Sequence, residues 1–264
     1  MVDRSTMGLF GPRGASHLPP IVRTIVPILG FFVVLQAFSF VTPPYIMPSV
    51  LEIASRYALL WVSAPGAVAS TFLRIIAGLA LAFVVGVSGG VAMGLNTTAR
   101  EYGETFVKFL TGIPGLSWVL IAVLWFSNVQ VRIVFVLFMV LFPWYTLSTM
   151  DAVRGIPRDY QDMVRSFRFS TREYTRKLVV PYILPDVVSI SKSNIGYAAR
   201  VVVVAELVGA SAGIGRELLV AQSQFDIVDI FAWTFVLVTI MLSLQGVLLV
   251  VERTQLNWRK AGGE

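Results

Sequence analysis

The stretch RSFRFSTREYTRKLVVPYILP, Arg165 to Pro185, places a dense group of basic side chains between two long apolar segments. The chain around it has 264 residues, of which 56% are hydrophobic and only 14% charged, and its mean hydropathy is +0.77. Water-soluble domains carry about 25% charged residues, so this chain has too little polar surface to be hydrated on all sides. The composition predicts an all-α integral membrane protein.

Apolar runs long enough for a helix that crosses ~30 Å of hydrocarbon recur along the chain. We predict six membrane helices, at about 21–43, 68–97, 106–127, 131–153, 183–210 and 228–252. The first run is preferred as a span over a signal peptide because it is long and no small-residue cleavage pattern follows it. Together the spans form one membrane domain over residues 21–252, between tails at 1–20 and 253–264.

The basic residues indicate the topology. Lys and Arg number 21 against 15 Asp and Glu, a formal net charge of +6. Six spans put both termini on one side, and most of the basic residues then fall on that side or at its border, as cytoplasmic segments require. We therefore predict cytoplasmic N- and C-termini. Topology explains the positive charge, so no nucleic-acid partner is expected.

Several kinds of site are excluded or unsupported. The chain has no cysteine, and His17 is its single histidine, which excludes thiol chemistry and histidine-rich metal sites. Neither the H-E-x-x-H nor the G-x-S-x-G pattern of hydrolases occurs. An intramembrane enzyme is therefore not supported.

Between the first two spans, Leu51, Ala54, Ala58 and Trp61 recur at helical spacing, and Pro65 follows. This pattern predicts a helix that lies on the outer membrane surface. A helix that packs on neighbouring spans is the alternative.

The connection after the fourth span, residues 155–181, is the longest polar one, and its pattern predicts two ordered helices. Gly155 suits a helix C-terminus and Pro157 the first turn of a new helix. Tyr160, Val164 and Phe167 form an apolar stripe. The sequence from Ser170 to Glu173 has the S-x-x-E pattern of a capping box that starts a second helix, and we expect Pro181 and Pro185 to end that helix and begin the fifth span.

Three simpler explanations compete for this connection: a topology signal, a patch for lipid headgroups, and a solvated loop. None of them needs two capped helices and an apolar stripe. We therefore favour a cytoplasmic docking surface for a soluble protein.

The chain resembles the permease subunits of bacterial binding-protein-dependent ABC importers, in the branch that handles nitrate, taurine and alkanesulfonates. The likeness rests on four stretches in order: STFLRIIAG (70–78), GIPGLSWVLIAVLWF (112–126), the connection 155–181, and VAELVGASAGIG (204–215). The family's cytoplasmic loop reads E-A-A-x-x-x-G-x(9)-I-x-L-P. Aligned on Pro181–Pro185, Asp162, Met163 and Val164 take the E-A-A positions and Arg168 takes the glycine position.

What the resemblance implies is an importer subunit without enzymatic activity of its own. We call residues 155–181 the coupling segment, since the family implies that it contacts an ATPase subunit. The residues implied in that contact are Tyr160, Asp162, Met163, Val164, Phe167, Arg168, Ser170 and Arg172. The implied partners are two ATPase subunits, a second permease chain (identical or related), a periplasmic or lipid-anchored substrate-binding protein, and membrane lipid, in a bacterial inner (cytoplasmic) membrane.

The sequence itself indicates that ATP is used elsewhere. A P-loop needs G-x-x-x-x-G-K-[ST], and none of the four lysines of the chain follows a glycine. No cofactor is expected in this chain, and ATP with Mg belongs to the partner ATPase. Arg168 stands where the family has glycine. This departure suggests one of two hypotheses: the groove of the partner ATPase has diverged to match, or the second permease chain is not identical to this one.

Charged or polar residues within the spans are candidates for the translocation path, since such residues usually face protein or water. They are Arg200, Glu206, Ser117, Trp118 and Arg74. A fixed cation at Arg200 suits a small anionic solute, but a structural ion pair with a neighbouring chain or subunit explains Arg200 equally well. For Arg74, a structural role is favoured over a role in the path. The rival function is an ion-coupled secondary transporter that uses Glu206 or Asp229.

Overall fold

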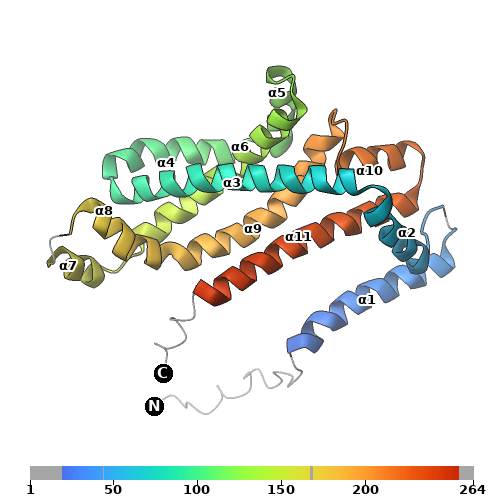
Figure 1. The fold of residues 1–264 in the computed structure, drawn as a ribbon, viewed down its shortest axis with the longest axis horizontal. Helices are drawn as coiled ribbons and strands as arrows, with labels where there is room; N and C mark the ends of the chain where they lie inside the picture. Colours follow the sequence, from blue (N-terminus) through green and yellow to red (C-terminus); the bar gives the residue numbers. More distant parts are fainter. Residues whose placement is uncertain (1–19, 44, 167–168, 256–264) are drawn as a thin grey trace, which may run out of the picture. The chain divides into compact units, whose positions relative to one another are not determined.

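A computed structural model describes residues 20–43, 45–166 and 169–255, and within them the regular structure is helical throughout. The elements are α1 (Pro20–Val41), α2 (Val50–Ser63), α3 (Pro65–Leu95), α4 (Thr97–Thr111), α5 (Gly115–Trp125), α6 (Val129–Arg154), α7 (Arg158–Ser166), α8 (Thr171–Tyr174), the π-helical turn η1 (Thr175–Val179), α9 (Val180–Leu207), α10 (Ile214–Ser223) and α11 (Ile227–Gln255) (Figure 1). The chain divides into two compact units, residues 1–52 and 53–264. The predicted all-α class is confirmed.

The first unit contains α1, which lies where the first span was predicted and includes Pro27. The backbone amide of Val50 donates to the side chain of Gln36 at 3.0 Å, which ties the start of α2 to α1. Ser49 and Glu52 cap α2 reciprocally. Because the Ser49 amide and hydroxyl donate to its carboxylate, the pKa of Glu52 lies below its ordinary value.

The second unit contains four helical stretches that are long and apolar enough to cross a membrane. They are Pro65–Leu95, Val129–Arg154, Thr171–Leu207 and Ile227–Thr254. They coincide with the predicted second, fourth, fifth and sixth spans. α11 runs on to Gln255, into the predicted C-terminal tail, and the rest of both tails lies outside the described residues.

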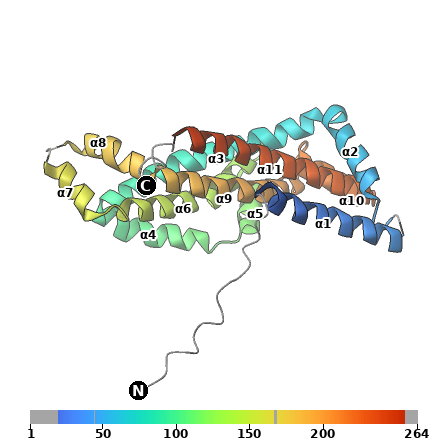
Figure 2. The ribbon, with the colours of Figure 1, turned by 90° about the horizontal axis from the view of Figure 1, so that it is seen from below.

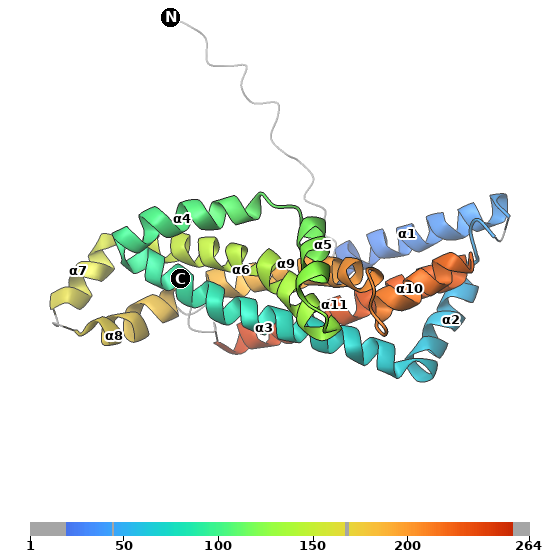
Figure 3. The same cartoon turned by 90° about the horizontal axis from the view of Figure 1, so that it is seen from above.

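The third predicted span, 106–127, is not one straight helix. α4 begins already at Thr97, and α4 and α5 meet at an angle of 93° (Figure 3). The break lies at Gly112–Pro114, because Pro114 has no amide hydrogen to continue α4 and instead precedes α5 as its N-cap. The pair is either one broken span or a re-entrant segment, and the apolar helix Ile25–Val41 within α1 is shorter than the four long stretches. The count of six spans therefore stays a prediction.

α3 and α6 form the central pair, and a row of small residues on α3 lets their backbones approach closely. Gly78, Ala82, Gly86, Gly90 and Gly94 are spaced four apart, and a Cβ atom added to any of these four glycines would meet residues of α6. A Cβ atom on Gly90 would lie 2.5 Å from the carbonyl oxygen of Thr146. This is the small-residue packing expected between membrane helices.

Within the second unit, residues 53–63 of α2 pack by a face other than the predicted stripe. Ile53 and Leu60 are each 3% exposed, whereas Leu51 and Trp61 face outward. The guanidinium of Arg56 forms an ion pair with Asp229 at the start of α11, with Nη2 to Oδ2 at 2.8 Å. Residues 53–63 therefore pack on neighbouring helices, which was the alternative to a helix on the membrane surface. The predicted apolar stripe is exposed.

The coupling segment lies at one end of the second unit, and α10 lies at the other (Figures 1 and 2). The predicted break at Pro181 and Pro185 is wrong, since one helical stretch runs from Thr171 to Leu207. η1 explains why: the Val180 amide donates to the Thr175 carbonyl, five residues back. This wider turn accommodates a proline in a continuing helix, where regular α-helical spacing would bring the ring against a carbonyl.

Candidate functional site

α7 divides its side chains between the core and the surface. Val164 is 6% exposed, whereas Tyr160 is 50% and Met163 53% exposed, and Asp162 is also exposed. The side-chain amide of Gln161 donates to the Ile156 carbonyl at 2.9 Å and fixes the start of the helix. Val164 therefore anchors α7 to the body of the protein and presents no docking surface, while Tyr160, Asp162 and Met163 lie on the exposed side of the helix.

The predicted capping box at the start of α8 is confirmed. The Glu173 amide donates to the Ser170 hydroxyl, and the Glu173 carboxylate accepts from the Ser170 amide at 3.1 Å. Lys177 pairs with Glu173 at 3.3 Å and lies 4.2 Å from the centre of the Phe169 ring. Arg172 is exposed beside them. α8 is therefore well ordered for its length. Phe167 and Arg168 lie outside the described residues.

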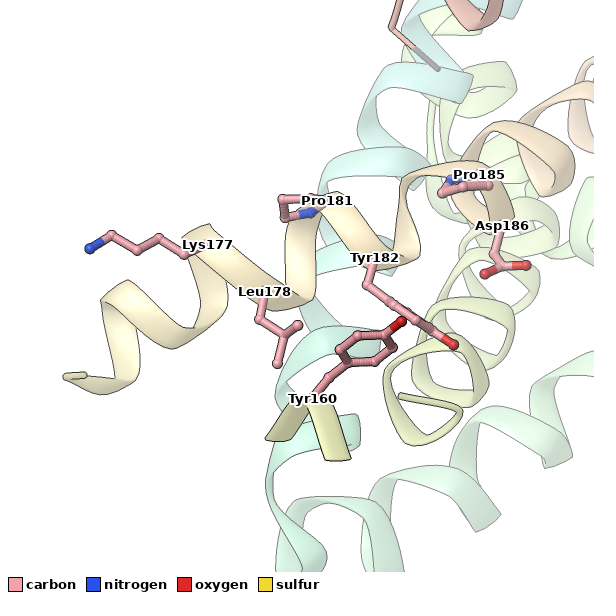
Figure 4. A pocket seen from close by; sticks show the side chains of 7 residues that line it. All are labelled: Tyr160, Lys177, Leu178, Pro181, Tyr182, Pro185 and Asp186. Atoms are coloured by element: carbon pink, nitrogen blue, oxygen red, sulfur yellow. The ribbon is translucent and has the colours of Figure 1, made fainter. Parts of the chain in front are cut away.

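A pocket of about 420 Å³ opens where α7 meets the start of α9 (Figure 4). The Tyr182 hydroxyl donates to the Gly155 carbonyl at 3.2 Å, and the rings of Tyr160 and Tyr182 lie 6.5 Å apart. Asp186 lies at one end of the pocket, and at the other end the side chain of Lys177 extends away from the two tyrosines (Figure 4). The lining residues are Tyr160, Lys177, Leu178, Pro181, Tyr182, Pro185 and Asp186. An aromatic, amphipathic hollow of this kind fits a side chain inserted by another protein.

At the other end of the unit, Arg74 and Glu206 form a buried ion pair that sequence reasoning did not predict. They are 2% and 0% exposed, and Nη1 of Arg74 lies 2.5 Å from the Glu206 carboxylate. The carboxylate also accepts from the Thr71 hydroxyl and from the Gly215 amide, at 2.9 and 2.8 Å. Arg74 donates in addition to Gln130 at 2.7 Å.

This network joins α3, α9 and the start of α10, because the Thr71 hydroxyl also accepts from the Ile214 amide at 2.8 Å. The close contact of Gly213 and Gly215 with Glu206 leaves no space for larger residues. Arg74 and Glu206 thus face each other in the protein interior, and their placement does not support the predicted role in a translocation path. The alternative of a structural role fits Arg74.

Arg200 is the one predicted path residue with an exposed charge. It lies on α9, donates through Nε to the Gly196 carbonyl at 3.0 Å, and lies 5.8 Å from the Tyr197 ring. Within the described residues, no carboxylate pairs with it. The guanidinium therefore remains available to a solute or to another subunit.

Ser117 and Trp118 lie on α5, directly after the bend. Trp118 is 7% exposed and packs edge-on against Phe135 of α6, and its indole N–H has no partner among the described residues. Ser117 is half-buried. The structure therefore places Trp118 in an aromatic core between α5 and α6.

Sequence reasoning missed Thr71, Gln130 and Arg132, all of which hold the end of the unit near α10. Arg132 is 8% exposed, and its Nη2 donates to the Gly209 carbonyl at 2.9 Å. The sequence does contain a signal by which Arg132 could have been found, since it is a charged residue at the end of an otherwise apolar span. Thr71 and Gln130 carry no such signal.

Comparisons with known proteins agree on one family. Residues 78–256 match the family model described as "Binding-protein-dependent transport system inner membrane component". The bicarbonate transport system permease protein CmpB of Synechococcus elongatus is 32% identical over 158 residues, 60% of this chain and 57% of the relative. The putative aliphatic sulfonates transport permease protein SsuC of Bacillus subtilis is 24% identical over 245 residues, 92% of this chain and 87% of the relative.

The nitrate import permease protein NrtB of Leptolyngbya laminosa is 26% identical over 148 residues, 56% of this chain and 53% of the relative. The chain thus spans little more than half the length of the bicarbonate and nitrate relatives. Among solved structures, the MetNI methionine ABC transporter in an inward-facing conformation has a chain with a TM-score of 0.64 at 16% identity, covering 75% of this chain and 98% of that one. At this identity, the likeness concerns the fold.

Proposed function

Because the chain belongs to the family of binding-protein-dependent transport system inner membrane components, we propose that it is the permease subunit of an ABC importer. In this proposal it forms the translocation path for a small anionic solute and transmits the work of ATP hydrolysis from a partner ATPase. The observation that carries the proposal is the coupling segment: two helices with exposed Tyr160 and Met163, held beside a pocket at one end of the spans.

The anionic character of the solute is supported by two observations. The relatives are named for bicarbonate, nitrate and aliphatic sulfonates, all of which are anions. Arg200 offers an exposed cation on α9, where a charge is costly unless it faces water, protein or a solute. Together they favour a path in which the guanidinium of Arg200 meets the solute.

The proposed partners follow from the family. They are two ATPase subunits on the cytoplasmic side, where α7 and α8 would dock, a second permease chain, identical or related, and a periplasmic or lipid-anchored substrate-binding protein. The chain would lie in a bacterial inner membrane with its termini in the cytoplasm. ATP and Mg would be bound by the ATPase, with no cofactor in this chain.

The ion-coupled alternative loses support from the structure. It requires a carboxylate that is free to exchange protons, but Glu206 is engaged by Arg74, Thr71 and Gly215, and Asp229 is paired with Arg56. Both candidates for proton exchange are therefore held by cations.

The experiment compares energy sources in reconstituted vesicles that contain the permease, its ATPase and the binding protein. Nitrate, bicarbonate or methanesulfonate serves as the test solute. Uptake is expected to require ATP on the side of the membrane that carries the ATPase, and to persist when the proton gradient is collapsed. Uptake that continues without ATP and stops with the gradient would overturn the proposal.

A further inference from the structure

The loop Gly209–Gly213, between α9 and α10, is held by two buried arginines, one at each end. Arg132 donates to the carbonyl of Gly209 at 2.9 Å, and Arg74 donates to the carbonyl of Ala212 at 2.7 Å. Gly209 and Gly213 both have positive φ, 81° and 123°, so the loop turns sharply between these two contacts. Two cations therefore lie beneath one short loop.

Only one of these two cations is neutralised within the described residues. Glu206 forms an ion pair with Arg74 at 2.5 Å, whereas no carboxylate oxygen of the described residues lies within ion-pair distance of Arg132. The Nε–H of Arg132 is buried and has no hydrogen-bond partner there. Arginine stays charged at any accessible pH, so the site keeps an uncompensated positive charge.

The surroundings of Arg132 increase this imbalance. The residue lies close to the N-terminal end of α6, whose helix dipole disfavours a cation. Asn128 already accepts from the amides of Gln130 and Val131, so those amides do not bind an anion themselves. A buried charge that is not paired is strongly unfavourable, which means that the protein gains stability if an anion enters beside Arg132.

We propose that Arg132, under the Gly209–Gly213 loop, is an oxyanion-binding site at the end of the protein opposite the coupling segment. A guanidinium presents parallel N–H donors that match two oxygens of one oxyanion, and Nε–H is the donor left unused. Gly209, whose carbonyl accepts from Arg132, and Ser211 of the same loop are both exposed, so this loop is the side from which a ligand would approach. The site is separate from Arg200 and does not depend on the proposed transport function.

The oxyanion has two sources, a free solute and a lipid phosphate, and the test separates them. The purified full-length chain in a neutral detergent is unfolded by heat with sodium nitrate or sodium chloride at equal ionic strength. The same measurement is repeated in chloride with phosphatidylglycerol added to the micelles. Tryptophan fluorescence, from the six tryptophans of the chain, reports unfolding.

A rise of the Tm in nitrate over chloride identifies a free anion, and a rise with phosphatidylglycerol alone identifies a lipid headgroup. In Arg132→Gln either rise is expected to disappear, with an apparent affinity at least tenfold weaker. Arg132→Lys keeps the charge and is expected to retain part of the rise. Arg216→Gln, which removes an exposed arginine of α10, is expected to behave like the unchanged protein.

If Arg132→Gln does not fold, the rise of the Tm is compared between Arg132→Lys and Arg216→Gln instead. Lysine cannot donate to two oxygens of one oxyanion in the way that a guanidinium does, so Arg132→Lys should bind the anion severalfold more weakly. The proposal is overturned if neither nitrate nor phosphatidylglycerol raises the Tm of the unchanged chain. It is also overturned if the rise is the same in the Arg132 variants. A carboxylate from another subunit would then be the group that neutralises Arg132.

Discussion

Arg74 of α3 and Glu206 of α9 lie 2.5 Å apart in the interior of the protein, although 132 residues separate them in the sequence. The pair holds α3 to the turn that leads into α10, together with Thr71 and Gly215. Because both charged groups are removed from water, each depends on the other for its stability in this position.

This dependence leads to a prediction about Glu206. Glu206→Gln leaves the guanidinium of Arg74 buried without its carboxylate, and such a change costs about 3–5 kcal/mol of unfolding free energy. Thermal unfolding of the purified chain measures the loss. The double variant Arg74→Met, Glu206→Met is expected to be more stable than Glu206→Gln, since it leaves no buried charge behind. Equal stability of Glu206→Gln and the unchanged chain would contradict the account.

The glycines of α3 provide a second prediction with a matched control. In Gly90→Ala the new Cβ meets the Thr146 carbonyl and the Thr149 side chain at 2.5 and 2.6 Å, so α3 and α6 must move apart. Overpacking of this kind costs about 1–3 kcal/mol. In Gly89→Ala the nearest atom lies at 3.8 Å, an ordinary contact.

The two alanine variants are compared by their unfolding temperatures and by the yield of folded protein. Gly89→Ala is expected to match or slightly exceed the unchanged chain, because alanine is favoured over glycine within a helix. The packing account fails if the two substitutions have the same effect.

These particular features show what the sequence was able to predict. Hydropathy located the helices of the four long stretches, and the S-x-x-E spacing located the Ser170–Glu173 capping box, because both signals are local. The Arg74–Glu206 pair is not local, and a helix-by-helix interpretation placed both residues in a path instead. Pairing between distant segments depends on how the helices pack, which periodicity does not encode.

The coupling segment shows the same limit on a smaller scale. Val164 belongs to the predicted apolar stripe, yet it faces the body of the protein, while Tyr160 and Met163 are exposed. The stripe indicated one apolar face correctly, but not which of its members would pack internally. Similarly, Pro181 predicted a break, whereas a π-helical turn before it keeps the helix continuous.

Arg200 leads to a prediction about transport. If the guanidinium contacts an anionic solute, Arg200→Gln removes a hydrogen bond to a charged group, worth about 1.5–3 kcal/mol. Uptake at low solute concentration should fall on the order of tenfold or more, and Arg200→Lys should retain part of it. Assembly with the ATPase is expected to be unchanged. Uptake that is insensitive to both substitutions would remove Arg200 from the path.

The central claim, that α7 contacts an ATPase, is tested most directly by photo-crosslinking from Met163. The chain contains no cysteine, so Met163→Cys introduces its single thiol, which is labelled with a benzophenone maleimide in the assembled complex and illuminated. We expect a covalent product with the ATPase subunit from position 163, and none from the control Arg216→Cys on α10. An assembled complex that yields no ATPase product from position 163, or equal products from both positions, would contradict the account.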